Sequence, residues 1–316
     1  MQTLDWQPAA DVDPAAFEER SVTLGTDDFA VPGTVSVPHG PGPHPAVVLL
    51  AGGGAFDRDG TAGPNKSLKD LAWGLATRGL AVLRFDKVTL VHADRFWASD
   101  PTVVQEYLPH ALAAIEMLGA IPSVDPNRIF VVGHSMGGKL APRVAEAAPG
   151  VAGIAILAGD TAPMQWAMLR VLRHLAEVDP ATAATLPAEE TIIAQARAVD
   201  SPDLSPATPS SELPFGAPGS YWLDLRSYDP VATAAALDKP MFIAQGGRDY
   251  QVTIADDLSG WQHVLAARPE VTIRVYEADD HMFFPGAGPS LPADYLRAQH
   301  VDPALIADLA DWLSNR

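Results

Sequence analysis

Short runs of apolar residues alternate along the chain with longer stretches in which apolar residues recur at helical spacing. The short runs are rich in β-branched residues and are bounded by Gly, Pro or Asp, which is typical of strands buried on both faces of a parallel sheet. The predicted strands cover residues 46–50, 81–85, 129–132, 154–157, 241–244 and 272–276, and the predicted helices cover residues 67–78, 103–118, 139–148, 255–267 and 303–313. This alternation predicts an α/β fold with helices on both faces of a mostly parallel sheet.

Upstream of the first of these strands, the pattern favours an antiparallel strand pair. Residues 21–24 and 34–37 are the two strands, and we expect them to be joined through Gly33, because glycine commonly marks a turn. A Pro-rich segment then leads into the first parallel strand. The pair is expected to extend one edge of the sheet.

An insertion at residues 160–236 interrupts the alternation. It contains helical runs at 163–177 and 188–199, followed by a stretch rich in Pro and Ser at 201–220. We expect the insertion to sit over the carboxyl edge of the sheet. There it is either a cap or lid that shapes a pocket, or a segment simply packed onto the body.

Length and charge narrow the class of protein. The chain has 316 residues and a formal net charge of −18, and we expect a single α/β domain over residues 1–316. A nucleic-acid binder needs clustered Lys and Arg, so nucleic acid is not an expected partner, and anionic membranes are disfavoured as well. Residues 1–20 are acidic and lack the basic and apolar regions of a signal peptide, which predicts a cytoplasmic protein. The chain has no cysteine, so thiolate catalysis and disulfides are excluded.

The most informative motif is Gly133-His134-Ser135-Met136-Gly137, which lies between a predicted strand and a predicted helix. This is G-x-S-x-G in the strand-turn-helix setting that its chemistry requires, with the serine hydroxyl exposed on a strained turn. Residues two before and two after the serine must lack side chains for the turn to close. Ser135 is therefore the predicted nucleophile.

A serine nucleophile needs a histidine base and a carboxylate that orients it, in the chain order Ser, acid, His for this kind of turn. Asp249 follows the predicted strand 241–244 through a Gly-rich turn, and His281 follows the last predicted strand. We predict a Ser135–His281–Asp249 triad. Among the nine histidines His300 is the nearest rival, and Asp279 and Asp280 are rival acids, although their place beside His281 favours a role in shaping its loop.

Acyl transfer also requires hydrogen-bond donors for the oxyanion. One should be the N–H of Met136, and the other should come from the glycines that follow the first parallel strand, either Gly53 or Gly54. These glycines are not followed by the residues of a phosphate-binding loop. No metal-ligand cluster such as H-E-x-x-H occurs, so we expect no catalytic metal and no cofactor.

The chain resembles the EstD-like bacterial serine esterases, a branch of the α/β-hydrolases related to dienelactone hydrolases and prolyl oligopeptidases. The resemblance covers residues 21–316 and rests on several segments besides the G-x-S-x-G motif. They are Phe56-Asp57-Arg58-Asp59-Gly60, residues 65–73 (NKSLKDLAW), Arg84-Phe85-Asp86-Lys87, residues 133–143 (GHSMGGKLAPR), residues 221–225 (YWLDL) and residues 246–252 (GGRDYQV). Departures from the family pattern are Gly52-Gly53-Gly54-Ala55 in place of Gly-Ser-Gly-Pro, Val88 in place of a basic residue, and Asp-Asp-His-Met-Phe-Phe around His281.

The resemblance implies an α/β-hydrolase fold and a carboxylesterase for short acyl chains such as acetyl, with the same three catalytic residues and no cofactor. The expected partner is a small acyl ester, and a homodimer is compatible with the sequence. Candidate substrate contacts are Phe56, His134, Trp166, Tyr221, Trp222 and Tyr250. Two alternatives stay open: an acyltransferase or macrolactone-forming enzyme that uses the same triad, and a ligand-binding protein that keeps the fold without turnover.

Overall fold

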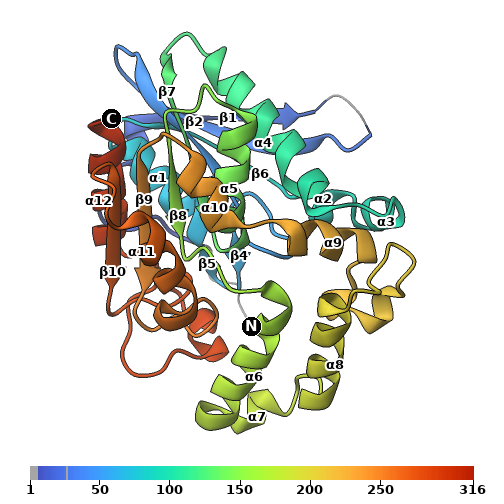
Figure 1. Cartoon of the computed structure of the whole chain (residues 1–316). Coiled ribbons are helices and arrows are strands. Elements are labelled where there is room, and N and C mark those ends of the chain that lie inside the picture. Colours follow the sequence, from blue (N-terminus) through green and yellow to red (C-terminus); the bar gives the residue numbers. More distant parts are fainter. Residues whose placement is uncertain (1–5, 26–27) are drawn as a thin grey trace.

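A twisted sheet of eight strands runs through the centre of the computed structural model, with helices on both faces (Figure 1). The structure describes residues 6–25 and 28–316. The first five residues of the segment 1–20, which was expected not to be a signal peptide, lie outside the described residues. The strand order is β1-β2-β6-β3-β7-β8-β9-β10. From β6 to β10 all neighbouring strands are parallel, whereas β1, β2 and β6 pair antiparallel. The predicted mostly parallel α/β fold is thus confirmed.

The strands and helices have the following bounds. The strands of the sheet are β1 Phe17–Leu24, β2 Val31–Pro38, β3 His44–Leu50, β6 Ala81–Phe85, β7 Val124–His134, β8 Gly153–Leu157, β9 Met241–Gly246 and β10 Val271–Tyr276, and the short pair is β4 Thr61–Ala62 and β5 Asn65–Lys66. The helices of the body are α1 Ser67–Thr77, α2 Val88–Val91, α3 Ala93–Ala98, α4 Val103–Gly119, α5 Met136–Ala147, α11 Ser259–Leu265 and α12 Pro303–Ser314. The helices of the insertion are α6 Ala167–Val178, α7 Pro180–Ala183, α8 Glu189–Asp200, α9 Gly219–Ser227 and α10 Pro230–Ala236.

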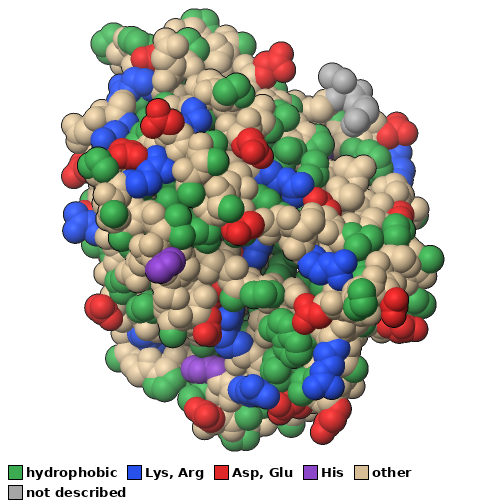
Figure 2. All heavy atoms as spheres, in the orientation of Figure 1, with side chains coloured by type: hydrophobic (Ala, Val, Ile, Leu, Met, Phe, Trp, Pro, Cys, Tyr) green, Lys and Arg blue, Asp and Glu red, His purple; other side chains and the backbone are tan. Residues whose placement is uncertain are grey.

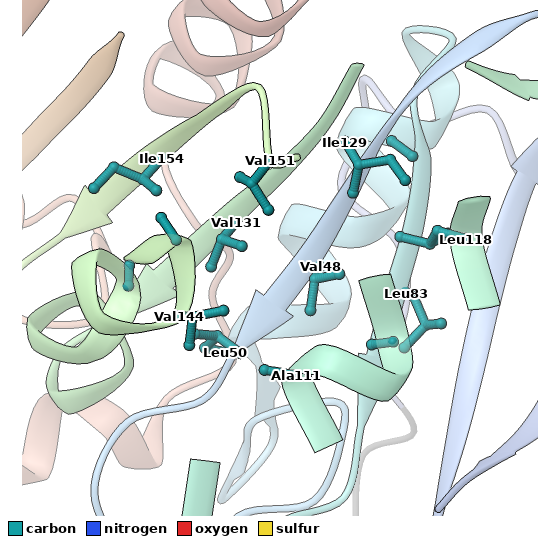
Figure 3. Packing of buried hydrophobic residues seen from close by; sticks show 14 of the residues in the cluster. Val48, Leu50, Leu83, Ala111, Leu118, Ile129, Val131, Val144, Val151 and Ile154 are labelled. Carbon is teal, nitrogen blue, oxygen red and sulfur yellow. The ribbon is translucent and has the colours of Figure 1, made fainter. Parts of the chain in front are cut away.

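The sheet separates two hydrophobic cores. Side chains alternate between the faces of a strand, so in β3 Val48 and Leu50 face one core while Val47 and Leu49 face the other. Figure 3 shows the first core, in which Val48 and Leu50 pack with residues of α4 and α5. The second core lies under α1 and α12. Because residues 46–50 of β3 are buried on both faces, they form a continuous apolar run with no polar alternation.

The amino-terminal strand pair forms at the edge of the sheet as predicted, but Gly33 is not its turn. Gly33 lies inside β2, where it pairs with Val22 of β1 and Phe85 of β6. A Cβ atom at this position would stand 3.1 Å from the Arg84 carbonyl oxygen. The glycine therefore relieves a tight contact between neighbouring strands, whereas the sequence pattern predicted a turn here.

Two predicted helices begin elsewhere. Helix α5 starts at Met136, three residues before the predicted start. The predicted start was late because Gly137 and Gly138 are poor helix formers. The predicted helix 255–267 begins as a π-helical turn at Ile254–Leu258 and continues as α11. Helices α2 and α3, which follow Lys87, were not predicted from the sequence.

The insertion at residues 160–236 is mostly helical. Helices α6, α7 and α8 stand apart from the sheet in Figure 1, whereas α9 and α10 pack against α4 and α5 of the body. The predicted helical runs correspond to α6 and α8. Within the Pro-rich stretch 201–220 the chain forms two short 3₁₀ turns and begins α9 at Gly219.

Candidate active site

Ser135 lies on a sharp turn between β7 and α5. Its backbone has φ 53° and ψ −123°, a conformation that residues other than glycine rarely adopt. A Cβ atom at Gly133 would stand 2.1 Å from the Gly137 carbonyl oxygen, and one at Gly137 would stand 2.5 Å from the Leu50 carbonyl oxygen. Both glycines are therefore required for the turn, which raises the serine above the carboxyl end of the strand.

Asp249 and His281 meet at the same end of the sheet, on the loops that follow β9 and β10. The Nδ1 atom of His281 lies 2.7 Å from Oδ2 of Asp249, and both side chains are buried. The other carboxylate oxygen of Asp249 accepts hydrogen bonds from the backbone N–H groups of Gln251 and Val252, and Gln245 donates to Oδ2. Three donors besides the histidine thus hold the carboxylate in place, so His281 meets a fixed acceptor.

The electrostatics suit a histidine base. Burial alone lowers the pKa of His281, but the Asp249 carboxylate beside it outweighs this effect and leaves the pKa raised above its ordinary value. Because Nδ1 faces Asp249, Nε2 is the ring nitrogen left for proton transfer. No hydrogen bond joins the Ser135 hydroxyl to His281 within residues 6–25 and 28–316, although both residues line one cavity. Such bonds often tighten only when substrate binds.

The rival residues take other roles. His300 pairs with Asp70 at 3.0 Å, and Asp280 accepts the backbone N–H groups of Met282 and Phe284, so it shapes the His281 loop. His134, a candidate substrate contact, lines the cavity, and its ring centre lies 4.9 Å from that of His281.

His134 also contacts the backbone of the histidine loop. Its Nε2 atom lies 2.8 Å from the carbonyl oxygen of His281, which can only accept, so Nε2 carries the proton. Burial, and next the charge of His281, lower the pKa of His134 to about 4. His134 is therefore neutral at pH 7 and holds His281 by its main chain.

The predicted oxyanion donors surround Ser135. Met136 is the first residue of α5, so its N–H group has no partner within the helix and stands at the positive end of the helix dipole. Gly53 and Gly54 lie on the loop after β3, and both line the same cavity. A Cβ atom at Gly53 would stand 3.4 Å from the Met136 sulfur and 3.7 Å from the Met136 Cβ, so the two residues are neighbours.

The cavity above Ser135 has a volume of about 590 Å³. This lies within the range of about 300–1,000 Å³ that is typical of pockets for small molecules. Its wall is mostly apolar, and four of the seven methionines of the chain contribute to it: Met136, Met164, Met168 and Met282. In Figure 2 hydrophobic side chains gather around a hollow near the middle of the face shown.

The candidate substrate contacts divide into two groups. Phe56, His134, Tyr221 and Trp222 line the cavity. Trp166 and Tyr250 are not part of the cavity wall that the described residues form. Trp166 instead donates to Asp200, and Tyr250 stacks on His174 with ring centres 4.5 Å apart.

Several residues at the site were not predicted from the sequence. Trp97 and Thr89 line the cavity from α3 and α2, and Glu106 does so from α4. Glu106 forms a buried ion pair with Lys87. Both charges were present in the sequence, but no local pattern shows that two such residues will be buried together.

The described residues contain no group of histidine and carboxylate side chains that could hold a metal ion. Nor do they form a helix that is long and apolar enough to cross a membrane.

Comparison with known proteins places these features in context. The sequence profile of the alpha/beta hydrolase family matches residues 47–297. Esterase EstD of Thermotoga maritima is 36% identical over 304 residues, which make up 96% of this chain and 69% of that protein. Est1E of Butyrivibrio proteoclasticus matches the fold with a TM-score of 0.60 at 13% identity, covering 94% of this chain and 99% of that one. An esterase of Pyrococcus furiosus matches with a TM-score of 0.56 at 15% identity, covering 100% and 98% of the two chains.

Proposed function

Because the chain belongs to the α/β-hydrolase family, we propose that it is a serine carboxylesterase that cleaves short-chain acyl esters through Ser135, His281 and Asp249. The observation that carries this proposal is the buried 2.7 Å contact between His281 and Asp249 beside a cavity that His281 and the strained Ser135 both line. The similarity to an esterase along 96% of the chain supports the same reaction class.

The reaction proceeds in two halves. The Ser135 hydroxyl oxygen attacks the ester carbonyl carbon while Nε2 of His281 takes its proton. The oxyanion that forms accepts a hydrogen bond from the Met136 N–H and a second from the glycine loop. His281 then gives the proton to the leaving alcohol as the carbon–oxygen bond breaks, and water repeats these steps to release the acid. Asp249 keeps the histidine in the required tautomer and stabilises its cation.

The insertion at residues 160–236 acts in this proposal as a cap over a single α/β domain. Met164 from the 3₁₀ turn before α6, Met168 from α6, and Tyr221 and Trp222 from α9 form part of the cavity wall. Methionine is flexible and polarisable, so this wall adapts to acyl and alcohol groups of different shape. A cytoplasmic location and a homodimeric state are further proposals, which cell fractionation and size-exclusion chromatography would test.

The test is hydrolysis of p-nitrophenyl esters from acetate to decanoate by the wild-type protein, Ser135→Ala and a control, Ser314→Ala, which lies exposed at the end of α12. We expect turnover of the short esters by the wild type and the control, and loss of about 10³-fold or more in Ser135→Ala. A fluorophosphonate probe should label the wild type at Ser135 and leave Ser135→Ala unlabelled.

The outcomes separate the alternatives. Labelling of Ser135 without ester hydrolysis would indicate transfer to a specific acyl acceptor and would refute the esterase. A wild-type protein that is neither labelled nor active would refute catalysis by Ser135. Turnover that persists in Ser135→Ala would refute the nucleophile assignment.

A further inference from the structure

A buried polar cluster lies beneath the glycine loop that borders Ser135. Lys87 and Glu106 are 3% and 4% exposed, and their side chains form an ion pair at 2.6 Å. The Lys87 ammonium also donates to the Gly52 carbonyl oxygen at 2.7 Å and to the Tyr107 hydroxyl at 2.8 Å. An ammonium group has three donors, and all three are used here.

The Gly52 carbonyl is held from two sides. The Tyr107 hydroxyl accepts a hydrogen bond from Lys87 and donates its own proton to the Gly52 oxygen at 2.9 Å. In a trans peptide the carbonyl and the following N–H point in opposite directions. Fixing the Gly52 oxygen toward Lys87 and Tyr107 therefore fixes the Gly53 N–H on the opposite side of the peptide plane.

The glycine loop adjoins the nucleophile. A Cβ atom at Gly52 would stand 3.1 Å from the Ser135 Cβ, so this part of the loop lies directly against the serine. The Gly53 N–H donates to no acceptor in the part of the protein that the structure describes, although Gly53 lines the cavity. A free N–H beside the nucleophile is the arrangement that an oxyanion donor requires.

We propose that Lys87 is a positioning residue which, together with Tyr107, orients the Gly52–Gly53 peptide so that the Gly53 N–H is the second oxyanion donor. This inference rests on the proposed ester hydrolysis. The ammonium also polarises the peptide through its carbonyl, which makes the Gly53 N–H a stronger donor as the oxyanion forms. Neither effect requires Lys87 to touch the substrate.

Glu106 completes the cluster. Its carboxylate neutralises the Lys87 ammonium, so the buried cation has a counter-charge. Its second oxygen accepts the Tyr221 hydroxyl at 2.6 Å, so α9 of the insertion is tied to the same cluster. The Lys87 ammonium therefore contacts the glycine loop directly and is linked to Tyr221 of α9 through Glu106.

The test compares Lys87→Met/Glu106→Gln, which removes both charges together, with Tyr107→Phe, which removes one donor to the Gly52 oxygen and keeps the ring. Arg84→Met is the control: Arg84 is a cation only 2% exposed, paired with Glu19 and Asp59 and without contact to the glycine loop. For each protein, kcat and KM for a p-nitrophenyl ester and the inhibition constant of a trifluoromethyl ketone, which forms a tetrahedral oxyanion on serine, are measured. Thermal unfolding reports stability.

Loss of a whole oxyanion donor costs about 10² to 10³ in kcat, so loosening this one should lower kcat by about 10- to 100-fold in the double variant and by about 3- to 10-fold in Tyr107→Phe. KM should change by less than about two-fold, and the ketone should bind more weakly in proportion to the fall in kcat. Arg84→Met should lose stability and keep kcat.

Two results would overturn the inference: folded variants with wild-type kcat, or a loss that appears in KM while ketone binding is unchanged. If the double variant does not fold, Tyr107→Phe decides alone by the same measurements. Absence of ester turnover in the wild-type protein would instead refute the proposed function, so the two failures are distinguishable.

Discussion

Replacing Asp279 with asparagine should stabilise the protein, and more strongly at pH 8 than at pH 5. Asp279 is fully buried, and no N–H group among the described residues donates to its carboxylate oxygens, whose side-chain partner is the carboxyl group of Asp302. Burial, and next the negative charges of Asp302 and Asp280, raise the pKa of Asp279 from 3.8 to about 7. A pKa raised in the folded state means that ionising the group costs folding free energy.

The size of the effect follows from the shift. The protonated form favours folding fully below pH 3.8, and this contribution is lost as the pH rises toward about 7. One pKa unit corresponds to about 1.36 kcal/mol, so the loss is about 2 kcal/mol at pH 5 and about 4 kcal/mol above pH 7. Asparagine carries no charge, so the Asp279→Asn variant does not lose this folding free energy as the pH rises. Its advantage over aspartate should therefore grow by about 3 kcal/mol between pH 5 and pH 8.

Urea unfolding at both pH values would measure this difference, with the linear dependence on denaturant giving the free energy of unfolding. Asp311→Asn is the matched control, because Asp311 is exposed on α12. A stability difference between Asp279→Asn and the wild type that stays constant from pH 5 to pH 8 would refute the reasoning. So would a control that reproduces the effect.

Three further predictions concern the active site and residues 160–236. In Gly137→Ala the new Cβ would meet the Leu50 carbonyl oxygen at 2.5 Å, so the turn must distort, and fluorophosphonate labelling of Ser135 should slow by about 10²-fold or more. Asp249→Asn should lower kcat by about 10⁴-fold and move the acid limb of the labelling rate to lower pH, because the charge that raises the pKa of His281 is gone. Trp222→Ala should cost about 3–5 kcal/mol of stability in urea unfolding, because the indole is 1% exposed.

Much of the candidate site could be predicted because it depends on local geometry. The turn around Ser135 closes only with glycine at both flanking positions, so the constraint is written within five consecutive residues. Asp249 and His281 could be found because each directly follows a strand, and the carboxyl ends of parallel strands meet at one edge of the sheet.

The remainder depends on contacts between distant segments. Lys87 and Glu106 lie on separate elements and resemble ordinary surface charges in the sequence, and only the packing of α4 against the glycine loop brings them together. Trp166 and Trp222 are both aromatic residues of the insertion, and both were predicted to contact substrate. Trp222 lines the cavity, whereas the indole of Trp166 lies outside the cavity wall and donates to Asp200. Apolar content alone does not say which face of an irregular segment turns inward.

The methionines in the cavity wall make the site sensitive to oxidation. Met136, Met164, Met168 and Met282 line the space above Ser135, and the chain contains no cysteine that could react in their place. Peroxide would convert these apolar thioethers to polar sulfoxides, which disrupts an apolar wall. Damage of this kind is reversed by methionine sulfoxide reductases and is not repaired by thiol reductants, so an oxidised preparation should recover its pocket only with such an enzyme.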